Sequence, residues 1–404
     1  MSRTSRSFLR AFAGTALVAG AALAFSAQPS KAEDFKYPKF FNIVSPIVGS
    51  ANHSLSVAWS SEFSAKTGVR VRVLPTSTGY DRSSWLNTGQ GLISLVQPSD
   101  FFDQMDGTEG YVVKDAGPRD NRLAFVGLVT PWGFMVRGNG NIKTVDDIKK
   151  GTRVVFYSGS TFISNGIRGL VAMAGLTMDD VEKVEVGGYA ANTKVLTEGR
   201  ADVTFTSPLS GTSYEAEASP NGIAWLNIDP KHPGFAKYRA LSAGYVLTKT
   251  VAGTKSAIGV TMDHAYQSNH VLEETSPDLV YHIVKWLMEN HDLYKDKFTH
   301  AKMLNMDNLV GYLEAGALVP YHEGTIRYLK EKGKWNDKFQ ARQDQLVALT
   351  KKRVAVFNEA VAAAEKAGID VKTPNDKWKA FWADYRGKHG EGKPFSEEVD
   401  ALPM

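Results

Sequence analysis

The sequence contains no cysteine. This absence excludes disulfides, thiolate catalysis, cysteine-ligated metals and a lipid-modified N-terminal cysteine. An excess of charge is also missing from the rest of the chain. The formal net charge of +4 comes from the basic residues of an N-terminal leader that has no acidic residue, and the chain after the leader has 43 basic and 43 acidic side chains. The leader residues are Arg3, Arg6, Arg10 and Lys31. The balance gives no long-range field that would attract nucleic acid or an anionic membrane.

Motifs of common catalytic sites are absent as well. The segment "VVFYSGSTFISNG" (154–166) has no Gly-x-Gly-x-x-Gly and no following lysine for a nucleotide, and "GSTFI" lacks the closing glycine of a hydrolase elbow. None of the nine histidines lies in His-Glu-x-x-His, and His322 is better explained as a loop or helix-cap residue than as a base. We therefore expect a protein that binds without catalysis, metal or cofactor.

The first 32 residues have the pattern of a secretory signal peptide. Three separated arginines precede an uncharged stretch (11–27), and Ser30 and Ala32 provide the small residues of a cleavage site. The separated arginines favour the general secretory route over the twin-arginine route. No later stretch is long and uncharged enough to span a membrane, since the best (240–260) contains Lys249 and Lys255. We expect a periplasmic protein with no direct membrane insertion.

After the leader, short strand-like runs alternate with amphipathic helical segments. The runs "FFNIVS" (40–45), "VRVRVLP" (69–75) and "LISLVQP" (92–98) make one such series, and "TRVVFY" (152–157), "VEKVEV" (181–186) and "ADVTFTSP" (201–208) make another. Thr144 with Asp147 and Thr177 with Asp180 have capping-box spacing. Alternation of this kind predicts an α/β fold of two doubly wound lobes with parallel strands.

The order of these segments also predicts the domain organisation. We expect lobe 1 to comprise residues 33–130 and 246–341, lobe 2 to comprise 131–245, and a helical extension to comprise 342–404. Two connecting segments would then form a hinge with a cleft between the lobes. In the extension, Trp378, Phe381, Trp382 and Tyr385 have helical spacing, which favours a core-docking face over a partner surface.

Four loops rich in glycine and hydroxyl groups follow predicted strands: 45–54, 75–83, 157–164 and 206–213. In open parallel sheets ligands bind beyond the carboxyl ends of strands, where helix N-termini present free N–H groups. Each loop alone can be a helix cap, but four at equivalent positions favour one shared anion site. The predicted ligand-binding residues are Gly49, Ser50, Asn52, Ser77, Thr78, Gly79, Tyr80, Arg82, Ser158, Gly159, Ser160, Thr161, Thr206 and Ser207.

Arg82 is the only cation among these residues. It lies in the first turn of a predicted helix, where the helix dipole disfavours a cation unless an anion or a carboxylate is near. A bound anion, a salt bridge to Asp81 and a solvated position are all compatible with this location. Tyr80, Trp132, Tyr157 and Tyr189 could supply an aromatic wall or belong to the core.

The chain from about residue 40 to 335 resembles the TAXI family, the solute-binding subunits of tripartite ATP-independent periplasmic (TRAP) transporters. The segment "LVPYHEGTIRYLKEKG" (318–333) is similar to that family's Pro-x-His-x-Gly-x-x-x-Tyr motif. The segments "IKTVDDIKKGTRVVF" and "VLTEGRADVTFTSP" also follow the family's order. The binding loops depart from the family, with Arg82 at a position where an asparagine is usual.

This resemblance implies a type II periplasmic-binding-protein fold that closes on a solute and delivers it to TRAP membrane subunits. The family's ligands are small organic acids, so the expected ligand is a dicarboxylate, an oxo-acid or an acidic amino acid. We expect a monomer with no cofactor. Two other functions stay open: a ligand sensor that presents the same cleft to a receptor kinase, and an extracytoplasmic enzyme, which the absent motifs disfavour.

Overall fold

The computed structural model describes residues 35–48, 50–157, 160–242 and 244–403. The predicted signal peptide lies outside these residues. Tyr37–Met404 form one compact unit. Across the described ranges, no helix is both long enough and apolar enough to span a bilayer.

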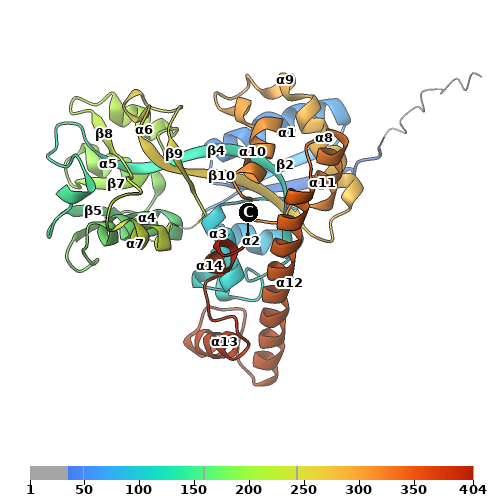
Figure 1. Cartoon of the computed structure of the whole chain (residues 1–404). Helices are drawn as coiled ribbons and strands as arrows, with labels where there is room; N and C mark the ends of the chain where they lie inside the picture. Colours follow the sequence, from blue (N-terminus) through green and yellow to red (C-terminus); the bar gives the residue numbers. More distant parts are fainter. Residues whose placement is uncertain (1–34, 49, 158–159, 243, 404) are drawn as a thin grey trace, which may run out of the picture. The chain divides into compact units, whose positions relative to one another are not determined.

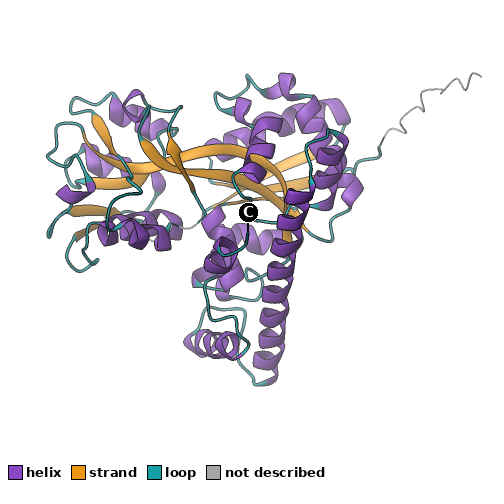
Figure 2. Ribbon diagram, viewed as in Figure 1, coloured by secondary structure: helices purple, strands orange, loops and turns teal. Residues whose placement is uncertain are grey.

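One ten-stranded sheet runs through this unit in the order β2-β1-β3-β10-β4-β7-β5-β6, with β9 beside β10 and β8 beside β4 (Figures 1 and 2). The strands are β1 (Phe40–Pro46), β2 (Arg70–Thr76), β3 (Ile93–Val96), β4 (Asn121–Arg137), β5 (Arg153–Phe156), β6 (Glu182–Glu185), β7 (Val203–Thr206), β8 (Ile223–Leu226), β9 (Val246–Lys249) and β10 (Thr261–Leu272).

The sheet consists of two halves with the same plan. In each half three strands are parallel, β2-β1-β3 in one and β6-β5-β7 in the other. Each triplet then pairs with one antiparallel strand, β10 beside β3 and β4 beside β7. The strands β4 and β10 also pair with each other and run through both halves (Figure 1). The predicted α/β fold of two lobes joined by two segments is confirmed.

Helices cover both halves of the sheet. We call the half with β1–β3 and its helices lobe 1, and the half with β5–β8 and its helices lobe 2. The helices of lobe 1 are α1 (Ala51–Thr67), α2 (Gly79–Asn87), α3 (Pro98–Asp106), α8 (Pro277–Glu289), α9 (His291–Tyr294), α10 (Met306–Glu314) and α11 (Glu323–Glu331). Those of lobe 2 are α4 (Thr161–Met173), α5 (Tyr189–Thr197), α6 (Gly211–Glu217) and α7 (Phe235–Leu241).

Local sequence explains many of the element ends. Gly68 ends α1 in the left-handed conformation with φ 74°, which costs a residue without a Cβ little. Thr144 and Asp147 form the predicted capping box at a short 3-10 helix, Val145–Asp147. Thr177 and Asp180 make the same side-chain bonds, but a turn follows and not a helix.

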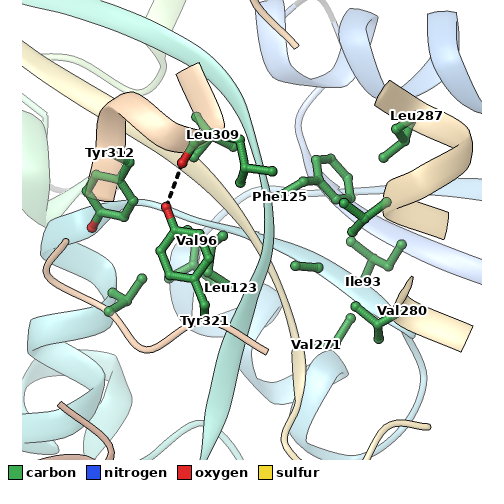
Figure 3. Close-up of a cluster of buried hydrophobic side chains, with 14 of the residues drawn as sticks. Ile93, Val96, Leu123, Phe125, Val271, Val280, Leu287, Leu309, Tyr312 and Tyr321 are labelled. Atoms are coloured by element: carbon green, nitrogen blue, oxygen red, sulfur yellow. Dashed lines mark hydrogen bonds between the residues drawn. The ribbon is translucent and has the colours of Figure 1, made fainter. Parts of the chain in front are cut away.

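Each lobe has its own hydrophobic core. In lobe 1, Ile93, Leu123, Phe125, Val271 and Leu287 are fully buried between the sheet and its helices (Figure 3). The Tyr321 hydroxyl in this core donates to the Leu309 carbonyl at 2.9 Å (Figure 3). In lobe 2 the core gathers around β4, β7 and α4, and its buried members include Trp132, Phe134, Phe162, Ile167 and Phe205.

The chain returns to lobe 1 later than predicted. Tyr245, Leu247 and Ala265 still pack in the core of lobe 2, whereas Val271 packs in the core of lobe 1. The change of core therefore lies inside β10, whereas the predicted lobe boundary lies at 245/246. The sequence pattern could not locate it because β10 is a continuous strand without a turn at the crossing.

The C-terminal extension consists of α12 (Asp337–Lys366), α13 (Asp376–Lys388) and α14 (Phe395–Asp400) (Figure 1). Trp378 and Trp382 are buried against Phe357 and Val112, so the core-docking interpretation holds. Arg353 of α12 is fully buried and pairs with Asp106 at the end of α3, at 2.9 Å, and with Glu391 at 2.8 Å. These contacts anchor the extension on α3 of lobe 1.

Candidate functional site

Three of the predicted loops end at helix N-termini, and one hydroxyl caps each helix. Ser50 accepts from the His53 backbone N–H at 3.2 Å, Thr78 from the Asp81 N–H at 3.1 Å, and Ser160 from the Ile163 N–H at 3.3 Å. Capping satisfies one of the four N–H groups that each helix end leaves unpaired. The structure therefore gives Ser50, Thr78 and Ser160 a structural role at the places where α1, α2 and α4 begin.

The fourth loop is built differently. Ser210, not a residue of β7, caps α6. The buried Thr206 hydroxyl at the end of β7 lies 3.1 Å from the hydroxyl of Tyr189, which begins α5, and Ser207 accepts from the Leu209 N–H at 3.2 Å. Thr206 thus connects the carboxyl end of one strand to the start of the next helix.

The remaining predicted residues lie in different settings. Gly49, Ser158 and Gly159 fall outside the described residues. Ser77 and Tyr80 are exposed, and the Tyr80 ring meets Tyr111 edge-on with centroids 6.2 Å apart. Asn52 and Thr161 lie in the first turns of α1 and α4 and are partly buried.

Gly79 is required for a close approach at the start of α2. A Cβ at this position would lie 2.2 Å from the Tyr111 hydroxyl and 2.6 Å from an Asp100 carboxylate oxygen. Only a residue without a side chain fits there. Burial, together with the charge of Asp100, raises the pKa of Tyr111 well above its usual value.

Arg82 pairs with a carboxylate within the chain. The two alternatives to a bound anion, a salt bridge to Asp81 and a solvated position, are both wrong. It is buried, and its guanidinium donates to Asp100 at 2.9 Å, to the Leu95 carbonyl at 3.1 Å and to the Thr78 carbonyl at 3.1 Å. The compensating carboxylate is Asp100 of α3 and not Asp81. With its charge paired in this way, Arg82 positions the loop that carries Thr78 and does not offer a free cation to a ligand.

Trp132 of β4 lies among aromatic side chains of lobe 2. Its ring meets Phe162, in the first turn of α4, edge-on at 4.6 Å, and lies 6.2 Å from Tyr189. Phe162 in turn stacks on Tyr245 at 5.1 Å. Among the four predicted wall aromatics, Trp132 is the one buried at the junction of β4 with the starts of α4 and α5.

The lobes also contact each other through α3. The Tyr245 hydroxyl donates to the Ser99 hydroxyl of α3 at 3.0 Å. At Gly244, a Cβ would lie 2.7 Å from the Phe102 ring and 3.0 Å from Pro98. The first turn of α3 is thus in van der Waals contact with the segment that leads into β9.

A group of buried polar atoms lies on the two crossing strands and their neighbours, and of its residues Asn52 and Trp132 were among the predicted candidates. Thr130 Oγ1, Trp132 Nε1 and both side-chain amide atoms of Gln267 are buried and have no hydrogen-bond partner in the described part of the chain. The same holds for Gln97 Oε1 and Asn52 Oδ1. An unpaired buried polar atom costs about 1–3 kcal/mol, so these atoms favour a partner from outside the chain, such as water, an ion or a solute.

Two titratable side chains of β10 lie close to this group. The Tyr238 hydroxyl donates to the buried Asp263, and burial raises the pKa of Asp263 to about 6. Burial lowers the pKa of His270 to about 3, and its ring nitrogens bond Asn121 Oδ1 at 2.5 Å and Ser268 Oγ at 2.9 Å. Burial therefore shifts the protonation equilibrium of each side chain towards its neutral form.

Two cavities lie beside the sheet, and one of them reaches a predicted loop. The described residues include no cluster of three or more histidine or carboxylate side chains that could hold a metal ion. Each cavity has a volume of about 300 Å³. One lies beside Arg137 and Asp202 in lobe 2, and the other lies beside α1 and β2, lined by Val57 and by His53 of the predicted loop 45–54. The charged groups of the first cavity are paired, since Asp202 bridges Arg137 and Arg153.

A family model described as the NMT1-like family matches residues 50–333. The chain belongs to the NMT1-like family. The NMT1-like region begins at the cap of α1 and ends just after α11, so it contains both lobes and leaves out α12–α14. No curated protein matches the chain.

Solved structures with partial similarity to this NMT1-like chain are binding proteins. The alkanesulfonate-binding protein SsuA from Xanthomonas axonopodis pv. citri is 15% identical, with 89% of this chain and 96% of that chain covered and a TM-score of 0.39. SsuA from Escherichia coli is 14% identical (91% and 94% covered, TM-score 0.38). A phosphonate-transporter binding protein from Pseudomonas aeruginosa is 11% identical (81% and 99% covered, TM-score 0.41).

Proposed function

We propose that this chain is a periplasmic solute-binding protein that captures a small organic acid between its lobes and delivers it to the membrane subunits of a TRAP transporter. The observation that carries the proposal is the pair of crossing strands. β4 and β10 pair with each other, run through both half-sheets and bear buried unpaired polar atoms at the junction. A solute at that junction would touch both lobes.

Contact with both lobes is what makes closure possible. A ligand shifts a conformational equilibrium only by its difference in affinity for the two states, so a solute that touches one lobe alone cannot favour the closed state. The proposed lobes are the two cores that β4 and β10 connect, with the hinge inside these strands. The start of α3, bonded to Tyr245, is a contact that closure would change.

The proposed site combines the starts of three helices with the polar atoms at the crossing. The ends of α1, α2 and α4 present backbone N–H groups that favour a carboxylate, and Ser50, Thr78 and Ser160 set these helix ends. Asn52, Thr161, Thr206 and Ser207 complete the proposed lining, and Arg82 supports it from behind through Asp100.

The TRAP assignment rests on the sequence resemblance at 318–333. In the structure the residues of this motif have packing roles: His322 caps α11 by accepting from the Gly324 N–H at 3.2 Å, and a Cβ at Gly324 would lie 2.4 Å from the Pro277 carbonyl of α8. The motif therefore identifies how α11 docks on α8 and contributes no solute contact. The motif supports the proposal only as a sequence similarity to the solute-binding subunits of TRAP transporters.

A thermal-shift screen tests solute binding. Protein without residues 1–32 is stripped of carried-over ligand by partial unfolding and dialysis, and then screened with dicarboxylates, oxo-acids, acidic amino acids, sugars and cationic amino acids. Binding at a hundredfold excess over Kd stabilises by about 2.7 kcal/mol, which gives a clear shift. A response to acids supports the proposal. Shifts with neutral or cationic solutes alone would contradict the organic-acid part, and no shift with any class would contradict solute binding.

Transport in proteoliposomes tests the partner. TRAP membrane subunits are reconstituted, and uptake of the solute found in the screen is measured with and without the protein. The proposal predicts uptake that needs the protein and an ion gradient and proceeds without ATP. Uptake that requires ATP would show that the membrane partner is of another transporter class.

A further inference from the structure

Gln267 is a buried glutamine whose hydrogen-bonding capacity is unused. It lies in β10 with a fully buried side chain, and neither its amide oxygen nor its amide nitrogen has a partner among the described residues. Thr130 is 5% exposed and Trp132 is 7% exposed, and each has one unpaired polar atom. The Gln267 amide therefore needs one partner that donates and one that accepts, and a single hydroxyl can do both.

The register places these three side chains on one face of the crossing strands. Asp263 lies opposite Trp132 and Ala265 lies opposite Thr130. Opposite residues of an antiparallel pair share a face, and alternate residues along one strand do so as well. Gln267 follows Ala265 by two positions in β10. The β-bulge between Tyr266 and Ser268 has its extra residue in β4, so the side chains of β10 continue to alternate and Gln267 points to the same face as Ala265.

Two more unpaired amide oxygens, those of Gln97 and Asn52, belong to elements beside the Gln267 end of this face. β3 pairs with β10 up to Val96 and Ser268, so Gln97 lies one residue beyond, next to Gln267. Asn52 lies one turn before Leu55 on α1, and Leu55 is 3.2 Å from where a Cβ of Gly127 would be. We call Asn52, Gln97, Thr130, Trp132 and Gln267 the floor group.

We propose that the floor group reads a hydroxyl or amino substituent of the solute, with Gln267 as the residue that determines specificity. This inference rests on the proposed function and narrows the solute from small organic acids in general to hydroxy acids and amino acids. The amide oxygens of Asn52, Gln97 and Gln267 need a donor from the solute, whereas Trp132 and the Gln267 amide nitrogen need an acceptor.

An ionised dicarboxylate or oxo-acid does not meet these needs. Its oxygens only accept, so the amide oxygens would stay unpaired and would face a negative charge. A hydroxyl both donates and accepts, and an ammonium group beside a carboxylate offers the same pair of functions. The other carboxylate would lie at the helix ends, as proposed above, while the floor group contributes no charge.

The test compares solutes that differ by one substituent. Kd is measured by calorimetry for succinate, L-malate and L-aspartate, and for glutarate, 2-hydroxyglutarate and L-glutamate, with the wild-type protein and with Gln267→Met. We expect the substituted acids of one chain length to bind wild type at least tenfold more tightly than the unsubstituted acid. In Gln267→Met this preference should fall below about threefold, because methionine keeps the size of the side chain and removes its hydrogen bonds.

Stability without solute gives an independent readout. Replacing an unpaired buried amide by an apolar group of similar shape is neutral or stabilising, so Gln267→Met should not lower the melting temperature. Gln104→Met is the matched control. Gln104 is equally buried, but its amide donates to the Gly117 carbonyl at 3.1 Å and accepts from Asn121 at 2.8 Å, so its loss should lower the melting temperature.

Three results would overturn the inference. Equal affinity of wild type for substituted and unsubstituted acids would remove the role of the floor group but leave the proposed function intact. A preference unchanged in Gln267→Met would remove Gln267 as its determinant. Absence of binding by any of the acids would overturn this inference together with the organic-acid function.

Discussion

The pairing of Arg82 with Asp100 predicts a large loss of stability in Arg82→Ala. The two side chains are 8% and 12% exposed, and the guanidinium also bonds the Leu95 and Thr78 carbonyls. Removing one partner of a buried pair leaves an uncompensated charge and costs about 3–5 kcal/mol. The free energy of unfolding, measured by urea titration at pH 7 and 25 °C, should fall by about that amount.

Arg119→Ala is the matched control for this measurement. Arg119 pairs with Glu274 at 2.5 Å, but these side chains are 43% and 54% exposed, so the loss should be about 0–1 kcal/mol. Arg82→Met combined with Asp100→Asn should recover part of the loss, because the second substitution removes the buried charge. If Arg82→Ala costs no more than Arg119→Ala, and instead weakens solute binding in a stable protein, then Arg82 is a direct ligand and the assignment to Asp100 is wrong.

Two further substitutions test the surroundings of the site. Burial raises the pKa of Asp263 to about 6 from 3.8, so the contribution of this side chain to stability is present below pH 3.8 and is lost as the pH rises through 6. Asp263→Asn should therefore increase the free energy of unfolding, measured by urea titration, by about 3 kcal/mol at pH 8 and by much less at pH 4.5. An equal effect at both pH values would refute the assignment. Gly79→Ala should lower the free energy of unfolding by about 1–3 kcal/mol, since the new Cβ would overlap Tyr111 and Asp100. Gly211→Ala is the control: Gly211 has the same position in α6, a Cβ there would meet nothing within 4 Å, and the change should be close to neutral. Equal melting temperatures for the two variants would contradict the close approach at Gly79.

Local patterns were sufficient to predict much of the fold. Alternating or continuous apolar runs specify β1–β3 and β5–β7, and Gly68 marks the end of α1, because strand and helix periodicity depends on residues close in sequence. Ser50, Thr78 and Ser160 were predicted as ligand-binding residues, and the capping that the structure shows for them is also a local feature, since it is a bond to the third residue of the same helix.

Long-range pairing was beyond the sequence patterns. Asp100 lies 18 residues from Arg82, on the helix after the next strand, and only packing of α2 against α3 brings them together. Gln267 reads as an ordinary polar residue of a strand, and its neighbourhood with Gln97 and Thr130 depends on the register of β10 with β3 and β4. The one available signal was in β4, where Thr130 interrupts a mostly apolar strand, whereas Gln267 does not stand out among the many polar residues of β10.

Calorimetric titration of the stripped protein with L-malate and L-glutamate tests the central claim most directly. A solute-binding protein with its site at the crossing of β4 and β10 should bind at least one of these acids with one site per chain, and Trp132 fluorescence should change at the same concentrations because its ring nitrogen belongs to the floor group. Absence of binding heat with a protein whose circular dichroism shows it to be folded would contradict the account.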